Sequence, residues 1–189
     1  GLGGGGSDLA KKQTNDPARW TDMRGKKQED APPGSLLFKQ VDGSYIAYVP
    51  SERSDMSWVT YASEAEGYRL EYPDGWMVVI GESQGHETFA IHPPGTDLDR
   101  ESPSGPPGIT VQWTATYTSP APDDESIASL RFPRVQGGNG ETYTRTVWDQ
   151  QLVAAFPWRE GTLLITGTGG WDLTIDVFEH LIHSLRLGP

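Results

Sequence analysis

The stretch GYRLEYPDGWMVV, Gly67–Val79, carries the strongest fold signal in the chain. Its first half, Tyr68–Tyr72, alternates apolar and polar residues with the period of two that a half-buried strand shows. The residues Pro73–Gly75 that follow are typical of a turn. We expect this turn to reverse the chain, so that Trp76 begins the returning strand and points into a core between sheet and helix.

Segments of similar composition precede and follow this stretch. They are rich in β-branched and aromatic residues, and loops of Gly, Pro, Asp and Ser separate them. The predicted strands are Leu36–Val41, Tyr45–Val49, Trp58–Tyr61, Tyr68–Tyr72, Met77–Ile80, Thr88–His92 and Ile109–Thr118, with further strands within 142–158 and 160–170.

In the second half of the chain, helices are predicted at two places. Acidic residues open the segment 122–132, which favours a short helix there. Asp172–Arg186 has apolar residues three and four apart, the pattern of an amphipathic helix. We expect Trp76 to pack against Phe178 or Leu181 of this helix. Many strands followed by a helix that must cover one sheet face indicate an α+β fold.

Length and composition restrict the class of protein. A chain of 189 residues with 35 % hydrophobic residues is long enough for one domain with a polar extension. No apolar run approaches the length of a transmembrane helix, so we expect a soluble chain. The first residue, Gly1, indicates a processed or trimmed form. The absence of Cys excludes disulfides, thiol catalysis and thiolate metal sites, and a lipid-bearing Cys would have to precede Gly1.

Charge is unevenly distributed along the chain. Acidic and basic residues balance from Gly1 to Trp58, so the net charge of −11 arises in Val59–Pro189, where no Lys occurs. Such an acidic body repels nucleic acid and anionic lipid, and its natural counterpart is a cationic partner surface.

The segment 1–34 is predicted to be an arm. Its beginning, GLGGGGS, has the composition of a flexible linker, and the rest is too polar to fold alone. Pro17 after Asp16 favours a short helix that carries Trp20. Either the arm is a disordered tail, or it orders on a partner or along its own domain. The residues expected to contact a partner are Trp20, Met23, Lys26 and Lys27.

Two clusters of polar residues could bind a divalent ion. Asp97, Asp99 and Glu101 have the spacing that opens a calcium loop, although the Gly and Glu that complete such a loop are missing. Asp176, Glu179, His180 and His183 lie along one helix face and could hold zinc. A solvated helix face explains the second cluster better, because charged residues line the exposed side of most such helices.

The remaining motifs do not support catalysis or a nucleotide cofactor. The turn 167–172 lies between a strand and a helix, as in a dinucleotide fold, but Asp172 replaces the third glycine and would repel a pyrophosphate. Asp172 as an N-cap explains the same residues. There is no nucleophile elbow. We therefore predict no enzyme activity and no cofactor beyond a weak calcium or zinc ion.

Several motifs together resemble the PsbP-like family. They are Y-x-S-x-x-x-G-Y-x-L-x-Y-P-x-G-W (Tyr61–Trp76), the strand LLITGTGG before the last helix, and F-x-x-x-I-x-S-L-R-L (Phe178–Leu187). The family comprises extrinsic subunits of photosystem II and bacterial relatives, and shares its fold with a nuclear Ran-binding import factor. The resemblance covers 59–189; the arm 1–34 and the hairpin and connection 35–58 lie outside it.

The resemblance implies a fold and a function. The fold is an α-β-α sandwich with a central antiparallel sheet, on which the C-terminal helix packs. The function is that of a non-enzymatic accessory subunit, periplasmic or lumenal and peripheral to a membrane. It would dock on a larger membrane-bound complex, such as a photosynthetic or electron-transfer complex, through its arm and an aromatic surface. The alternative is a free-standing exported protein that binds a small ligand or a divalent metal.

Overall fold

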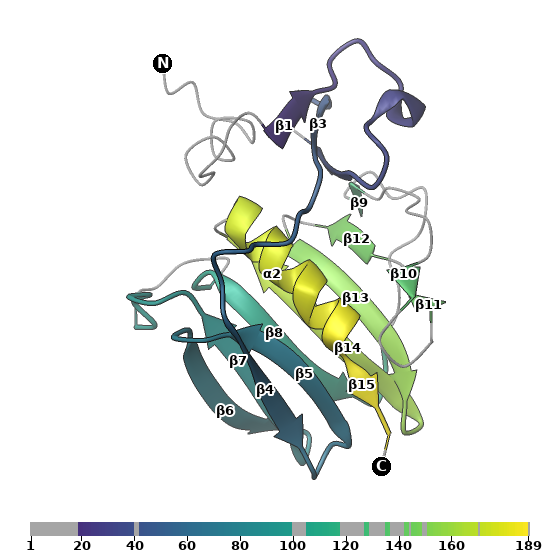
Figure 1. The fold of residues 1–189 in the computed structure, drawn as a ribbon. Coiled ribbons are helices and arrows are strands. Elements are labelled where there is room, and N and C mark those ends of the chain that lie inside the picture. The colour runs from purple at the N-terminus through teal and green to yellow at the C-terminus, as the bar shows by residue number, and fades with distance from the viewer. Residues whose placement is uncertain are drawn as a thin grey trace.

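The computed structural model describes residues 19–39, 42–99, 105–117, 127–128, 135–136, 142–143, 145–148, 151–169 and 171–188. These residues form an α+β fold of mostly antiparallel sheets with one C-terminal helix, as the sequence predicted (Figure 1).

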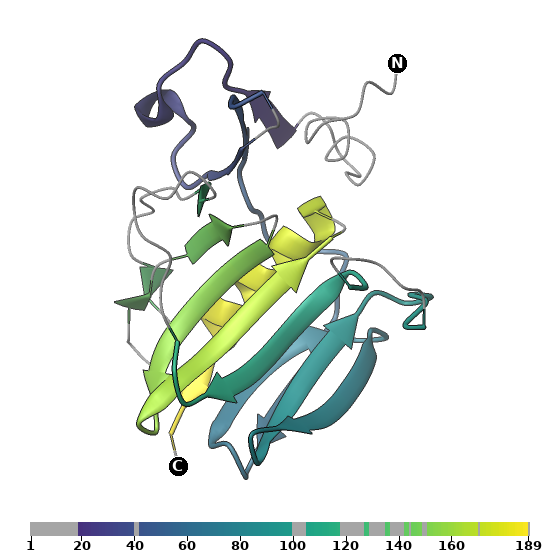
Figure 2. The same ribbon diagram turned by 180° about the vertical axis from the view of Figure 1, so that it is seen from behind.

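The largest sheet has seven strands and supports the main core. In spatial order they are β6 (Met77–Ser83), β7 (His86–His92), β8 (Gly108–Thr114), β14 (Gly161–Thr168), β13 (Gln151–Trp158), β12 (Arg145–Trp148) and β9 (Ile127–Ala128). All neighbouring strands are antiparallel. The view from behind shows the long strands side by side (Figure 2).

Smaller sheets and the helix complete the architecture. One sheet of three strands has the order β15 (Arg186–Leu187), β5 (Tyr68–Pro73), β4 (Trp58–Ser63). Another has the order β1 (Trp20–Asp22), β3 (Tyr45–Tyr48), β2 (Leu36–Lys39), and β10 (Val135–Gln136) pairs with β11 (Thr142–Tyr143). A 3-10 turn, η2, spans Gln28–Asp30, and the helix α2 spans Trp171–Ser184.

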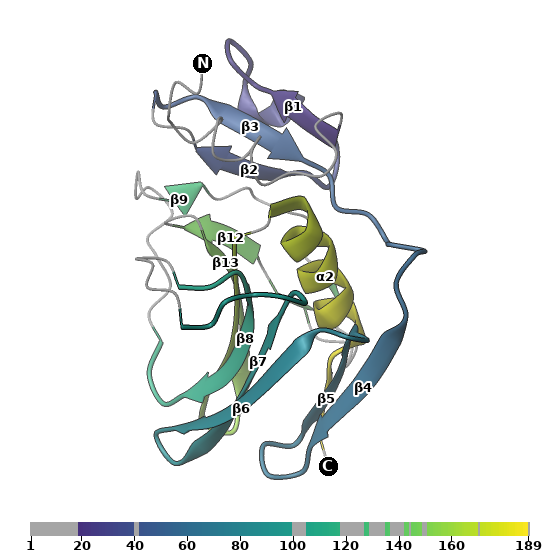
Figure 3. The ribbon, with the colours of Figure 1, turned by 90° about the vertical axis from the view of Figure 1, so that its left-hand side faces the viewer.

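Helix α2 lies between the seven-stranded sheet and the sheet β15–β5–β4 (Figure 3). Apolar side chains therefore cover it on more than one side, and Ile175, Val177, Phe178, Leu181 and Ile182 are all fully buried. They form one core with residues of both sheets. Exposing the apolar face of a sheet or of a helix to water is unfavourable, so these faces pack together.

The turn in the middle of the stretch Gly67–Val79 does not close a hairpin. Strand β5 belongs to the sheet β15–β5–β4 and β6 to the edge of the seven-stranded sheet, so the turn at Pro73–Gly75 passes the chain from one sheet to the other. Gly75 adopts φ +85°, a left-handed conformation that favours glycine. Trp76 is only 7 % exposed and belongs to the main core, which confirms the prediction of a core residue.

Two other local predictions are wrong, and the predicted C-terminal helix is confirmed with an earlier end. Trp20 lies in β1, not in a helix, because its backbone pairs with Tyr48 of β3. Ile127–Ala128, inside the predicted helix 122–132, is the edge strand β9. The C-terminal helix ends at Ser184, and the next residues form β15 against β5. In all three, pairing with a distant strand replaces the local preference for helix.

Candidate functional site

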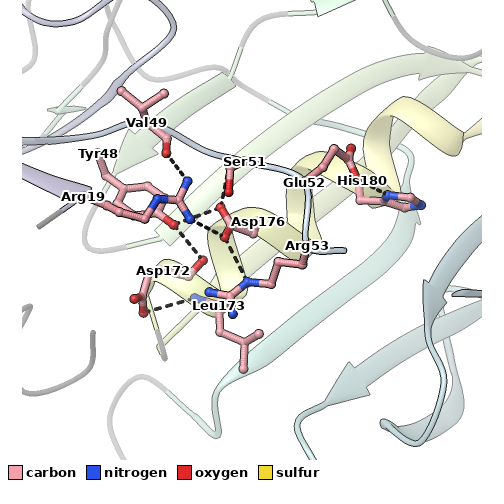
Figure 4. A network of polar contacts seen from close by, with 10 residues as sticks. All are labelled: Arg19, Tyr48, Val49, Ser51, Glu52, Arg53, Asp172, Leu173, Asp176 and His180. Carbon is pink, nitrogen blue, oxygen red and sulfur yellow. Dashed lines mark hydrogen bonds and ion pairs between the residues drawn. The ribbon is translucent and has the colours of Figure 1, made fainter. Parts of the chain in front are cut away.

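The most heavily bonded polar group in the described residues is the carboxylate of Asp176, in the first half of α2 (Figure 4). Its side chain is 1 % exposed. The oxygen Oδ2 accepts hydrogen bonds from Nη1 of Arg19 at 3.0 Å and from Nε of Arg53 at 2.9 Å. A buried carboxylate is stable only when paired and hydrogen-bonded, and these two guanidinium groups supply the pairing.

The other carboxylate oxygen of Asp176 has two donors of its own. Oδ1 accepts from the hydroxyl of Tyr48 at 2.9 Å and from the backbone N–H of Ser51 at 3.0 Å. Burial, and then the negative charge of Asp176, raises the pKa of Tyr48 above its ordinary value. Tyr48 therefore stays a hydrogen-bond donor at any ordinary pH.

Arg19 also fixes the first described residues of the arm. Its Nη2 donates to the carbonyl of Val49 at 2.6 Å, and its guanidinium lies 4.8 Å from the ring centre of Tyr48. Trp20, the next residue, packs on the same ring with 4.7 Å between ring centres. We infer from these contacts that the Asp176 cluster is a clamp that holds residues 19–22 and 45–53 against α2.

The predicted solvated helix face is wrong for half of its members. Asp176 and Glu179 are buried, at 3 % and 8 % exposure, and residues of the N-terminal segments cover Asp176. His180 is also engaged: Nδ1 lies 3.0 Å from a carboxylate oxygen of Glu52 and Nε2 lies 2.8 Å from one of Glu71. Its ring stacks on Trp58 with 3.4 Å between centres.

The two histidines of the predicted zinc site are engaged in other contacts, and the predicted calcium site lies only partly within the described residues. His180 uses both ring nitrogens in the contacts above, whereas His183 is bonded through Nδ1 to the carbonyl of Glu179 at 2.7 Å. In the calcium-like loop, an oxygen of Asp97 accepts the N–H of Asp99 at 3.0 Å, and Glu101 lies outside the described residues. Within the described part of the chain, no group of three or more acidic or histidine side chains is arranged to hold a metal.

The four residues expected to contact a partner lie in different environments. Met23 is 3 % exposed and packs with Leu37 and Ala47 in a small second core. Trp20 is half-buried against the main core. Lys26 and Lys27 are exposed, so in this conformation they are the members of the set that a partner can reach.

A second polar cluster ties the turn after β4 to the first residues of β7. The buried carboxylate of Glu66 lies 2.7 Å from Nδ1 of His86 and accepts the backbone N–H of Glu87 at 3.2 Å. The hydroxyl of Tyr61 donates to the carboxylate of Glu87. Burial, and then this contact with Glu87, raises the pKa of Tyr61.

The exposed apolar surface of the described residues is concentrated on β6. Val78, Val79 and Ile80 are consecutive and are 40 %, 42 % and 49 % exposed. Strand β6 is the last strand of the seven-stranded sheet and pairs on one side only, with β7. Its other side presents backbone N–H and C=O groups that can pair with an added strand.

Sequence reasoning missed both the Asp176 clamp and the exposed β6 edge. In the clamp, Arg19 is separated from Asp176 by 157 positions in the sequence and Arg53 by 123, so no local spacing could indicate it. For β6, the apolar run Met77–Ile80 signals a buried strand, and only the strand order reveals an edge.

Comparisons with known proteins add no relative to this description. Neither the protein-family models, nor the curated proteins, nor the solved structures contain a match to this chain. The PsbP-like resemblance therefore stays a prediction. As for membrane insertion, none of the described helices has the length and apolar character needed to cross a bilayer.

Proposed function

We propose that this protein is a non-enzymatic accessory subunit that docks on a larger membrane-bound complex. The observation that carries the proposal is the apolar edge strand β6. Proteins ordinarily protect such an edge with charge, proline or a covering element, because it pairs readily with another chain. Here three consecutive aliphatic residues leave it open, which favours docking by addition of a strand from a partner.

The net charge favours a different protein as the partner over a second copy. Two copies that met at β6 would bring together two bodies that each carry the acidic excess of the −11 chain. Like charges oppose such an association, whereas a basic segment of another protein is attracted. The partner strand we propose is therefore an extended segment of a membrane-complex subunit that carries Lys or Arg beside its apolar residues.

The wider setting rests on the PsbP-like resemblance and on the charge. They support a periplasmic or lumenal location, peripheral to a membrane, and a photosynthetic or electron-transfer complex as the type of assembly. The α-β-α sandwich is part of the same proposal. Such a sandwich has a second helical layer in addition to α2, and α2 is the α-helix of the described residues. The exposed Lys26 and Lys27 of the arm remain proposed secondary contacts.

The substitution Ile80→Lys tests the edge strand directly. A photo-crosslinker placed at Val79 should capture one subunit of the complex from the native membrane. Ile80→Lys should abolish the capture, because a lysine on an edge strand opposes further pairing. Leu98→Lys is the matched control: Leu98 is also an exposed aliphatic residue, at 37 %, but lies outside β6. The control should capture as well as the wild type.

Two outcomes would overturn the proposal. Equal capture by the Ile80→Lys and Leu98→Lys variants would show that β6 is not the docking element. A concentration-dependent dimer in sedimentation experiments, lost in Ile80→Lys, would show that a second copy occupies the edge. The melting temperature of each variant should match that of the wild type, because the side chain at position 80 is half in solvent.

One observation favours the alternative, a free-standing exported protein that binds a small ligand or a divalent metal. It is a pocket lined by arginines, and none of its lining residues belongs to β6. The positive charge of its lining favours an anion over a metal. The metal version of the alternative predicts a rise in melting temperature with calcium or zinc, and a flat response would count against it.

A further inference from the structure

Three arginines gather at one place on the otherwise acidic body of the protein. A pocket of about 600 Å³ lies where the turn after β4, strand β15 and the turn between β13 and β14 meet. Arg69, Arg159 and Arg186 line it, together with a single acidic residue, Glu64. Figure 1 shows β15 and the β13–β14 turn at the same end of the molecule, near the C-terminus.

Two of these arginines face each other across a strand pair. Arg69 of β5 and Arg186 of β15 are direct partners in the antiparallel register, so their side chains leave the sheet on the same face. Both are exposed. Like charges in directly opposite positions destabilise a sheet, and an anion bound between them would reverse the sign of this interaction.

Arg159 is held toward the same place by the backbone around it. It occupies the turn between β13 and β14 with φ +48°, a left-handed conformation that Gly or Asn adopts at less cost. Its Nη1 donates to the carbonyl of Ala65 at 2.7 Å. Gly67 makes room for it, because a Cβ there would lie 2.3 Å from Nη2. The two-residue turn Arg159–Glu160, with φ of +48° and +62°, presents this guanidinium to the pocket.

None of the three arginines forms an ion pair with an acidic residue of the described chain. Arg186 donates through Nη1 to carbonyls at the end of α2. Arg159 makes the bond to Ala65, and Arg69 has no side-chain hydrogen bond in the described residues. Most of their donors therefore remain for a ligand, in an arrangement with three positive charges and one negative charge.

We propose that this pocket binds a small, doubly charged oxyanion of the phosphate type. The net charge of its four ionised side chains matches the charge of a phosphate monoester near neutral pH. Planar guanidinium groups match the oxygens of phosphate with paired hydrogen bonds. The site is separate from the edge strand β6, so it is a second binding function and does not depend on the proposed docking.

Calorimetric titration of the full chain with inorganic phosphate at low ionic strength tests the site. We expect saturable binding. Arg69→Gln should weaken it roughly ten- to hundredfold, the usual effect of losing a hydrogen bond to a charged group. Glu64→Gln should strengthen it, because the only acidic group of the lining is removed. Arg24→Gln, the same change at an exposed arginine outside the pocket, should leave the affinity unchanged.

Folding and specificity have separate readouts. Without phosphate, Arg69→Gln should melt no lower than the wild type, because it removes a repulsion with Arg186, yet it should lose the rise in melting temperature that phosphate gives. Sulfate should compete, and chloride should not. Equal phosphate affinity of the wild type, Arg69→Gln and Glu64→Gln, or tighter binding of succinate than of phosphate, would overturn the proposal.

Discussion

Asp176 shows how strongly one residue can depend on partners far away in sequence. Its carboxylate is buried and accepts four hydrogen bonds from the segments that precede β4. We expect Asp176→Asn to lower the free energy of unfolding by about 3 kcal/mol, because Arg19 and Arg53 would keep their charge near a neutral amide. Urea denaturation measures the change.

Asp99→Asn is the matched control for this substitution. It makes the same chemical change at an exposed carboxylate, and surface changes of this kind usually stay within about 0.5 kcal/mol. If Asp176→Asn were as mild as Asp99→Asn, the clamp would contribute nothing to stability.

Buried tyrosine hydroxyls give the molecule a predictable alkaline limit. Burial is the first cause that raises the pKa values of Tyr48, Tyr61 and Tyr68 above the ordinary value near 10. Above about pH 10 the unfolded chain releases tyrosine protons that the native state keeps. The native state then binds more protons, so stability must fall as the pH rises further.

A titration followed at 295 nm checks this expectation. Tyr48, Tyr61 and Tyr68 should ionise only together with loss of structure in circular dichroism. In concentrated urea all should titrate together. Ionisation of every tyrosine near pH 10 with the fold intact would contradict the prediction.

At the scale of elements, the contact between the turn after β4 and the turn between β13 and β14 depends on a glycine. Gly67 has φ +73°, and a Cβ there would meet the guanidinium of Arg159. Gly67→Ala should cost about 1–2 kcal/mol from the left-handed backbone. It should cost about a further 1 kcal/mol, because Arg159 must give up its bond to Ala65.

Gly75→Ala separates the two contributions. Gly75 also has a left-handed backbone, φ +85°, but a Cβ there would meet no atom within 4 Å. In thermal unfolding, the melting temperature of Gly67→Ala should therefore be lower than that of Gly75→Ala. Adding Arg159→Ala to both should reduce the difference, and the remainder comes from the Trp158 ring, whose Cζ2 would lie 3.2 Å from the Cβ. An unchanged difference would show that the clash with Arg159 is not its source.

At the scale of the whole molecule, the described part of the arm belongs to the domain. Residues 19–22 add a strand to β3 and provide one of the two arginines of the clamp. Deletion of 1–34 should therefore lower the melting temperature by roughly 5–10 °C, which corresponds to about 2–3 kcal/mol for a chain of this size. Deletion of 1–18 removes none of the described contacts and should leave the melting temperature unchanged. Equal melting temperatures for the two deletions would contradict this assignment.

The sequence by itself determined the type of most elements and the character of the core. Alternation in Tyr68–Tyr72 predicted β5, and the spacing of apolar residues predicted α2, because a period of two or of 3.6 records which face of an element is buried. It also predicted that Trp76 lies in the core. The α+β class followed from the order of these elements along the chain.

Only the tertiary structure decided which strands pair and which polar residues are buried. The turn at Pro73–Gly75 passes between two sheets, and β6 lies at an edge, because strand order depends on contacts between distant segments. The local sequence predicts that Asp176 is a solvated helix residue. In the structure it forms ion pairs with Arg19 and Arg53, which are distant in the sequence. The periodicity of a segment indicates which of its faces is buried but not which distant segment covers that face. Both the clamp and the arginine pocket form between segments that are distant in the sequence.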